Sequence, residues 1–158
     1  MTDITTNTRP ASLTRTVDRA GEIATPLAET ALRIGAGLFL VPHGVQKLFG
    51  WMGGHGLEAT GQFFETQLGF AHGYLAALGA GSVETFGGLA LALGLATRAS
   101  ALAVAVLLLV AASVHVPAGF FWTNGGWEYP VLWAVIAFYF VARGGGQYSL
   151  DRAIGRVV

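Results

Sequence analysis

The chain has 158 residues, of which 53% are hydrophobic and 11% charged. Soluble domains carry about 25% charged residues, so this composition excludes an ordinary water-soluble globule and is typical of a membrane protein. The formal net charge is zero, which gives no indication of a nucleic-acid partner, and the chain has no cysteine. Thiol–disulfide chemistry, iron–sulfur ligation by thiolates and c-type haem attachment are therefore excluded within these residues.

The N-terminal segment, residues 1–24, is polar, and we expect it to be a cytoplasmic tail. It is rich in threonine and carries both acidic residues and arginines (Asp3, Arg9, Arg15, Asp18, Arg19 and Glu22). Apolar residues recur at helical spacing within it, so a short helix on the membrane surface is the alternative interpretation. Thr25 as an N-cap and Pro26 at the first helical position then predict where a membrane-spanning helix begins.

Four apolar stretches follow, separated by glycine-rich or turn-forming residues. We expect them to cross the bilayer over about residues 26–48, 72–95, 99–116 and 128–143. Pro42 should kink the first helix, and residues 57–65 favour one or two helical turns in the loop after it. The sequence therefore predicts an all-α membrane protein. Its fold would be an antiparallel four-helix transmembrane bundle over residues 25–143, with a cytoplasmic tail over residues 144–158.

The distribution of arginines predicts the orientation of this bundle. Arginines lie in the N-terminal segment, in the turn at Arg98 and at the C-terminal end, whereas the other two loops contain acidic residues and Lys47. Positively charged segments stay on the cytoplasmic side, so we expect both termini in the cytoplasm. All four tryptophans then lie near the outer interface, as in an aromatic belt (Trp51, Trp122, Trp127 and Trp133).

Three polar side chains interrupt the first apolar stretch, at Arg33, His43 and Lys47. At about 100° per residue they fall within roughly 80° of one another around a helix. Charged groups in membrane helices usually face a protein interior and are commonly functional. Gly37 and Gly44 lie close to the same face and would let a neighbouring helix approach.

Depth in the bilayer predicts which polar residues of different helices meet. His43, Lys47, His115 and Glu128 all lie near the outer ends of their helices, and Glu84 lies deeper, halfway along the second helix. We therefore predict one outward-opening polar cavity. Glu84 would form its floor, Arg33 would lie beneath, and tryptophans would surround its mouth (Trp51, Trp122 and Trp127).

The chemistry of this predicted cavity stays open at the level of the sequence. Glu84 is either one partner of a structural ion pair with Arg33 or Lys47, or a proton acceptor, and one group can serve both purposes. His43 and His115 are either hydrogen-bonded interface histidines, donors to a quinone headgroup, or axial ligands of a b-type haem. Two histidines without a spacing motif give no indication of a zinc site, so we predict no metal ligands.

Four motifs in this order resemble the DoxX family of small bacterial membrane proteins. They are Arg33 with Gly37, His43-Gly44-x-x-Lys47-Leu-Phe-Gly50, Glu84-x-x-Gly-Gly88 followed by Gly94-Leu-x-Thr-Arg98, and Gly144-x-Gly146-x-x-Ser149-Leu-Asp151. The resemblance covers about residues 32–151. It implies a four-helix protein of the bacterial inner (plasma) membrane, and some members are associated with quinone-linked oxidoreductase systems.

Two hypotheses for the function follow. In the first, the chain is a component of a quinone-linked membrane oxidoreductase system and works with a membrane or periplasmic oxidoreductase subunit. Glu84 and His43 would be its catalytic residues, and the ligand-binding residues would be Arg33, Lys47, His115, Glu128, Trp51 and Trp127. In the second, the chain is a non-catalytic membrane subunit or a small-solute carrier. A quinone is the cofactor that we expect first, and a b-type haem second.

Overall fold

The computed structural model describes residues 11–155, and all regular secondary structure in this range is helical, as predicted. The main helices are α1 (Ala11–Phe49), α2 (Gly56–Thr66), α3 (Gly73–Ser82), α4 (Gly88–Leu93), α5 (Thr97–His115), α6 (Glu128–Arg143) and α7 (Leu150–Ala153). A π-helical turn, η1 (Val83–Gly87), joins α3 to α4, and two short 3₁₀ turns, η2 (Val116–Ala118) and η3 (Trp122–Asn124), lie between α5 and α6.

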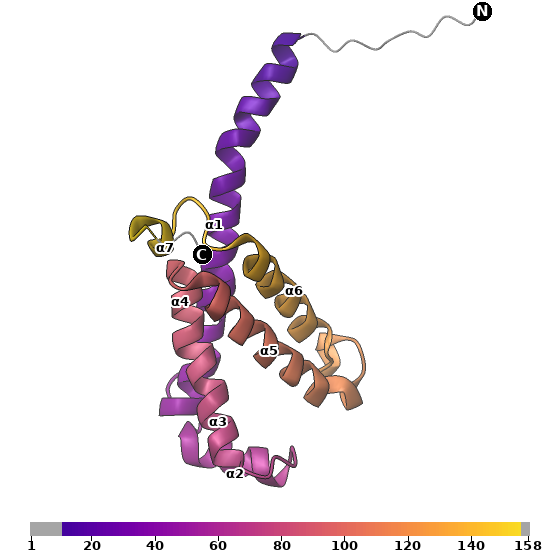
Figure 1. Ribbon diagram of the computed structural model, residues 1–158. Coiled ribbons are helices and arrows are strands. Elements are labelled where there is room, and N and C mark those ends of the chain that lie inside the picture. Colours follow the sequence, from indigo (N-terminus) through magenta and orange to yellow (C-terminus); the bar gives the residue numbers. More distant parts are fainter. Residues whose placement is uncertain (1–10, 156–158) are drawn as a thin grey trace, which may run out of the picture.

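The long helices run in alternating directions (Figure 1). α1 runs down the molecule, the rod formed by α3, η1 and α4 returns, α5 runs down again, and α6 runs back. The turn at residues 94–96 and the segment 144–153 lie together at one end, which we call the closed end. Helix α2 and the loop that joins α5 to α6 lie toward the opposite end, which we call the open end.

Three helical segments in the described part of the chain are long and apolar enough to cross a bilayer: Asp18–Phe49, Gly73–Leu93 and Thr97–Ala118. They correspond to the first three predicted spans. Helix α6 occupies the fourth predicted stretch, but its 16 residues are fewer than the ~20 that a perpendicular spanning helix needs.

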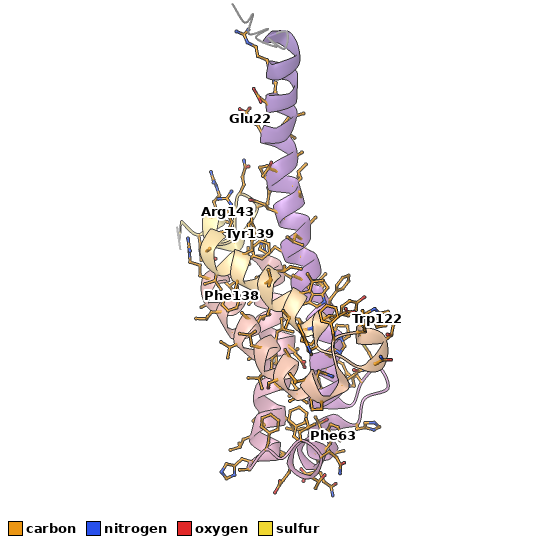
Figure 2. All side chains as sticks on the ribbon, turned by 90° about the vertical axis from the view of Figure 1, so that its right-hand side faces the viewer. Glu22, Phe63, Trp122, Phe138, Tyr139 and Arg143 are labelled. Carbon is orange, nitrogen blue, oxygen red and sulfur yellow. The ribbon has the colours of Figure 1, made fainter. Side chains whose placement is uncertain are left out.

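The helix start expected at Thr25 and Pro26 is wrong, because α1 begins at Ala11. The helix passes through both Pro26 and Pro42 without a break. Proline's fixed φ is itself helical, so within a helix it costs a hydrogen bond and some steric strain but does not have to end the helix. At 1.5 Å per residue, the 39 residues of α1 extend about 58 Å, well beyond a hydrocarbon core of about 30 Å. Figure 2 shows Glu22 on the part of α1 that extends past the other helices.

Close contact between α1 and α4 depends on glycine. A Cβ atom on Gly37 would collide with the carbonyl oxygen of Gly88 and with Ala92, and one on Gly88 would lie 2.7 Å from the carbonyl oxygen of Gly37. The backbones therefore touch directly, as small residues allow in membrane bundles. This confirms the predicted role of Gly37 in close packing.

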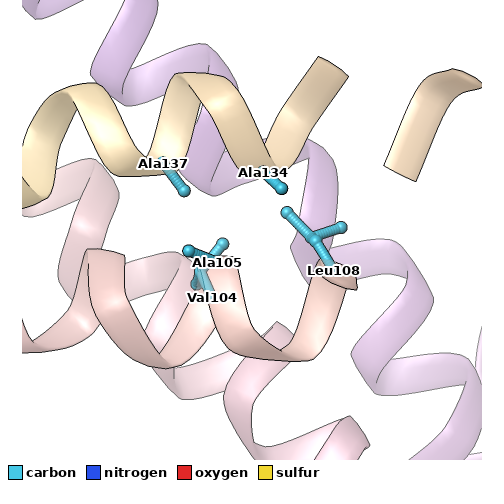
Figure 3. Close-up of a cluster of buried hydrophobic side chains, with 5 residues drawn as sticks. All are labelled: Val104, Ala105, Leu108, Ala134 and Ala137. Carbon is cyan, nitrogen blue, oxygen red and sulfur yellow. The ribbon is translucent and has the colours of Figure 1, made fainter. Parts of the chain in front are cut away.

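A second contact joins α5 to α6 through small and branched side chains (Figure 3). Val104, Ala105 and Leu108 of α5 pack against Ala134 and Ala137 of α6, and all five are buried. Alanine on one helix and larger side chains on the other let the two helices pack as a closely joined hairpin.

Substituting Gly37 with leucine should therefore force α1 and α4 apart. We expect Gly37→Leu to cost about 1–3 kcal/mol or more, the usual range for overpacking, and to lower the thermal unfolding temperature in detergent. Gly35→Leu is the matched control, since a Cβ on Gly35 meets nothing within 4 Å. Equal unfolding temperatures for the two variants would contradict the close helix contact.

Candidate functional site

A large cavity separates the α5–α6 hairpin from α1, α2 and α3, and its volume is about 1100 Å³. Much of its wall is aliphatic or aromatic, contributed by every long helix. Four of the polar residues selected from the sequence line it together: His43, Lys47, Glu84 and His115. Their convergence is the arrangement that helix face and depth predicted, while their chemical roles stay predictions.

An ion pair joins two walls of the cavity. Lys47 Nζ on α1 donates a 2.9 Å hydrogen bond to Glu84 Oε1 and lies 2.8 Å from Oε2. The Glu84 side chain is 12% exposed and that of Lys47 23%, so the pair is largely desolvated but still reaches the cavity. Lys47 Nζ also lies 3.3 Å from the His43 carbonyl oxygen, so three oxygen atoms of the chain surround the ammonium group.

The backbone at Glu84 is unusual, since the residue lies in the π-helical turn η1. Such turns widen a helix locally and occur frequently at functional sites. Close by, Gly44 allows α1 to approach, because a Cβ there would collide with Thr85. The turn and the glycine together bring Glu84 within reach of Lys47.

The two histidines of the cavity differ in their hydrogen bonding. His115 Nδ1 lies 2.7 Å from the carbonyl oxygen of Gly125. A carbonyl only accepts, so Nδ1 carries the proton and the neutral ring keeps Nε2 as its acceptor. Both histidine side chains are exposed at the cavity, one on α1 and the other at the end of α5.

Arg33 does not line the cavity and lies beyond it toward the closed end, three residues before the cavity residue Ala36. Its side chain is buried at the closed end, where Nη1 donates to the carbonyl oxygens of Leu91 (2.8 Å) and Ala92 (2.6 Å) and Nη2 donates to that of Tyr148 (2.7 Å). Arg33 shares an angular sector with His43, but ten residues correspond to about 15 Å along a helix.

Asp151 completes the closed end, and the sequence reasoning assigned it no partner. Its carboxylate accepts hydrogen bonds from the Ala96 and Thr97 amides (2.7 and 2.8 Å) and from the Thr97 hydroxyl (2.7 Å). It thus caps the first turn of α5 from more than 50 residues away. Ser149 is the N-cap of the short helix α7, because its Oγ accepts from the Arg152 amide.

Glu128, Trp51, Trp122 and Trp127 do not line the cavity, so their predicted role in ligand binding stays a prediction. Glu128 Oε1 accepts from the Trp122 amide at 3.0 Å and so orders the loop between α5 and α6. Trp51, Trp122 and Trp127 instead pack on Phe49, Tyr129 and Phe120, respectively. Trp122 thereby lies next to the cavity, because its partner Tyr129 is one of the lining residues.

Other aromatic residues form the cavity wall. Trp133 of α6 packs edge-on against Phe39 of α1, with ring centroids 5.7 Å apart, and Tyr129 lies one turn before Trp133. Phe39 stands four residues before His43, and this spacing on one helical face would have identified it. In the described part of the chain, no three histidine, aspartate or glutamate side chains form a group that could hold a metal ion.

Long apolar helices that enclose a largely buried ion pair define a helical membrane protein with an internal cavity. The chain belongs to the DoxX family, since the family model DoxX matches residues 28–117. The matched range includes Arg33, the His43–Lys47 motif, Glu84 and His115. No curated protein and no solved structure matches the chain.

The Lys47–Glu84 pair gives a prediction about stability. Glu84→Leu should leave the lysine without a partner and cost roughly 3–5 kcal/mol of unfolding free energy, the range for breaking a buried pair. The double variant Lys47→Met with Glu84→Leu should recover most of that loss, because no unpaired charge then remains. Unfolding in mild detergent measures both, and additive losses would show that the two groups are not coupled.

The closed end gives a second prediction. Asp151→Ala removes the acceptor for two amides and a hydroxyl and takes a negative charge away from buried Arg33. We expect a loss of about 3–5 kcal/mol, as for breaking a buried charged network. Asp18→Ala, on the exposed part of α1, should change stability by less than about 0.5 kcal/mol. Comparable losses for the two variants would contradict the structural role of Asp151.

Proposed function

We propose that the chain is an inner-membrane component of a quinone-linked oxidoreductase system and that its cavity holds the quinone headgroup. The observation that supports this proposal is the convergence of His43, Lys47, Glu84 and His115 on one otherwise apolar cavity. A quinone is flat and largely apolar, with two carbonyl oxygens that accept hydrogen bonds. Small-molecule sites of this kind combine apolar walls with a few placed polar groups.

The same proposal includes four membrane spans with both termini in the cytoplasm. Helix α6 is short but apolar, packs along its length against α5, and begins beside an aromatic loop. A slightly thinned bilayer and flanking residues accommodate a short span at modest cost. The closed end carries Arg98 and Arg143, which agrees with a cytoplasmic location.

The donor set of the cavity suits quinone carbonyls. Lys47 carries three N–H groups on the α1 wall, and Tyr129 and Trp133 add an O–H and an N–H on the α6 wall. A bound quinone accepts two electrons and two protons to become the quinol. In this proposal a partner subunit supplies the electrons, while Glu84 and His43 pass protons toward the carbonyl oxygens.

A second candidate is a non-catalytic subunit or small-solute carrier, and one observation favours it. The Lys47–Glu84 pair joins α1 to η1 and so has a structural role whether or not anything binds. A b-type haem held by His43 and His115 is the alternative occupant, since the Gly125 contact leaves Nε2 of His115 available as a ligand.

The four histidines of the chain provide a matched test. Wild-type protein purified in mild detergent should retain extractable quinone, and His43→Ala and His115→Ala should each weaken quinone binding about tenfold, which corresponds to the loss of one hydrogen bond. His55→Ala and His72→Ala should leave binding unchanged, because neither residue lines the cavity. Wild-type protein that neither retains nor binds quinone would contradict the proposed function, and a haem absorption spectrum would favour the haem alternative.

A further inference from the structure

The cavity has two chemically different halves. One half carries the polar residues of α1 and η1, namely His43, Lys47 and Glu84. The other half lies between α3 and α5, and apart from His115 at the end of α5 the side chains that these two helices contribute are apolar: Ala76, Ala80, Leu107, Leu108, Val110, Ala111 and Val114. A quinone headgroup needs hydrogen-bond donors, and these apolar side chains supply none.

The apolar half reaches the surface of the molecule at bilayer depth. Val110 lines the cavity and is also 43% exposed, and it lies within the apolar span Thr97–Ala118. Figure 1 shows α3 and α5 diverging from the closed end toward the open end. Because α5 packs on η1 and α4 near the closed end, the opening between α3 and α5 lies farther along α5, within the apolar span Thr97–Ala118 that hydrocarbon would surround.

The size of the cavity indicates an elongated ligand. Its volume of about 1100 Å³ lies at the upper limit of the ~300–1,000 Å³ typical of pockets for drug-sized molecules. A single ring with small substituents would fill only part of it. The part of the cavity that the ring leaves unfilled is bordered by the apolar wall. If that part stayed empty, the side chains lining it would lose dispersion contacts.

We infer that the ligand is a membrane-dissolved quinone with a long hydrocarbon tail. It enters sideways between α3 and α5, and Ala80 and Ala111 leave the space for its tail. This inference rests on the proposed function and adds the entry route and the tail-binding surface to it. The two alanines face the cavity from opposite walls, so a larger side chain at either position would occupy the path of the tail.

The test compares two probes on the full chain in lipid nanodiscs: a quinone with a long isoprenoid tail and the same headgroup without a tail. Binding is followed by quenching of tryptophan fluorescence, since Trp133 lies in the cavity wall. Ala111→Phe should weaken binding of the tailed quinone about tenfold or more and change binding of the tail-less headgroup by less than about twofold. Ala80→Phe, on the opposite wall, should do the same and serves if Ala111→Phe does not fold.

Ala103→Phe is the control, because Ala103 is exposed on α5 and does not line the cavity. It should leave binding of both probes unchanged. Equal effects of Ala111→Phe and Ala80→Phe on the two probes, or no effect on either, would overturn the tail path while leaving the headgroup site standing. Failure of both probes to bind wild-type protein would instead contradict the proposed function itself.

Discussion

Burial of the Arg33 guanidinium is the constraint on which the rest of the structure depends. Arg33 is 1% exposed in an apolar environment, so the chain must supply acceptors for it from elsewhere. The acceptors are the carbonyl oxygens of Leu91 and Ala92, near the end of α4, and that of Tyr148. Asp151 adds a nearby carboxylate and also caps α5. One charged side chain on α1 thereby fixes the positions of α4, the start of α5 and the C-terminal segment. The glycine contact between Gly37 and Gly88 lies just beyond this network and allows it to form.

The same network explains why the cavity lies at the other end. At the closed end Arg98 donates to the carbonyl oxygens of Val141 and Ala142, and Glu29 accepts from Tyr139 and Arg143, whose positions on α6 Figure 2 shows. The Arg98 contacts join α5 to α6, and the Glu29 contacts hold α6 to α1. Toward the open end the hairpin diverges from α1 and α3, and aromatic side chains such as Phe39 and Trp133 bridge part of the separation. A bundle tied at one end and splayed at the other encloses a wedge of space.

Much of this arrangement could be predicted from the sequence, because periodicity and depth are properties of a single helix. Residues on one helical face near one end must meet their counterparts on neighbouring helices, which is why His43, Lys47, Glu84 and His115 were found together. Arg33 does not line the cavity because ten residues separate it from His43, and an angle around a helix carries no information on that distance. The stacking partners of Trp51, Trp122 and Trp127 could not be predicted, because no periodic pattern identifies neighbours such as Phe120. Asp151 was missed because its partners are more than 50 residues away.

The Lys47–Glu84 pair connects the stability of the bundle to its proposed chemistry. Neither charge can be left alone in an apolar wall, so a ligand that takes a hydrogen bond from Lys47 must leave Glu84 compensated. Protonation of Glu84 provides that compensation, since a neutral carboxyl group no longer needs the lysine and can itself donate. In the proposed function, movement of Lys47 toward a quinone carbonyl and uptake of a proton by Glu84 are therefore coupled. In this proposal the ion pair that holds α1 against η1 also binds the proton, at Glu84, and the ligand carbonyl, at Lys47. Its remaining exposure to the cavity is what makes both roles compatible.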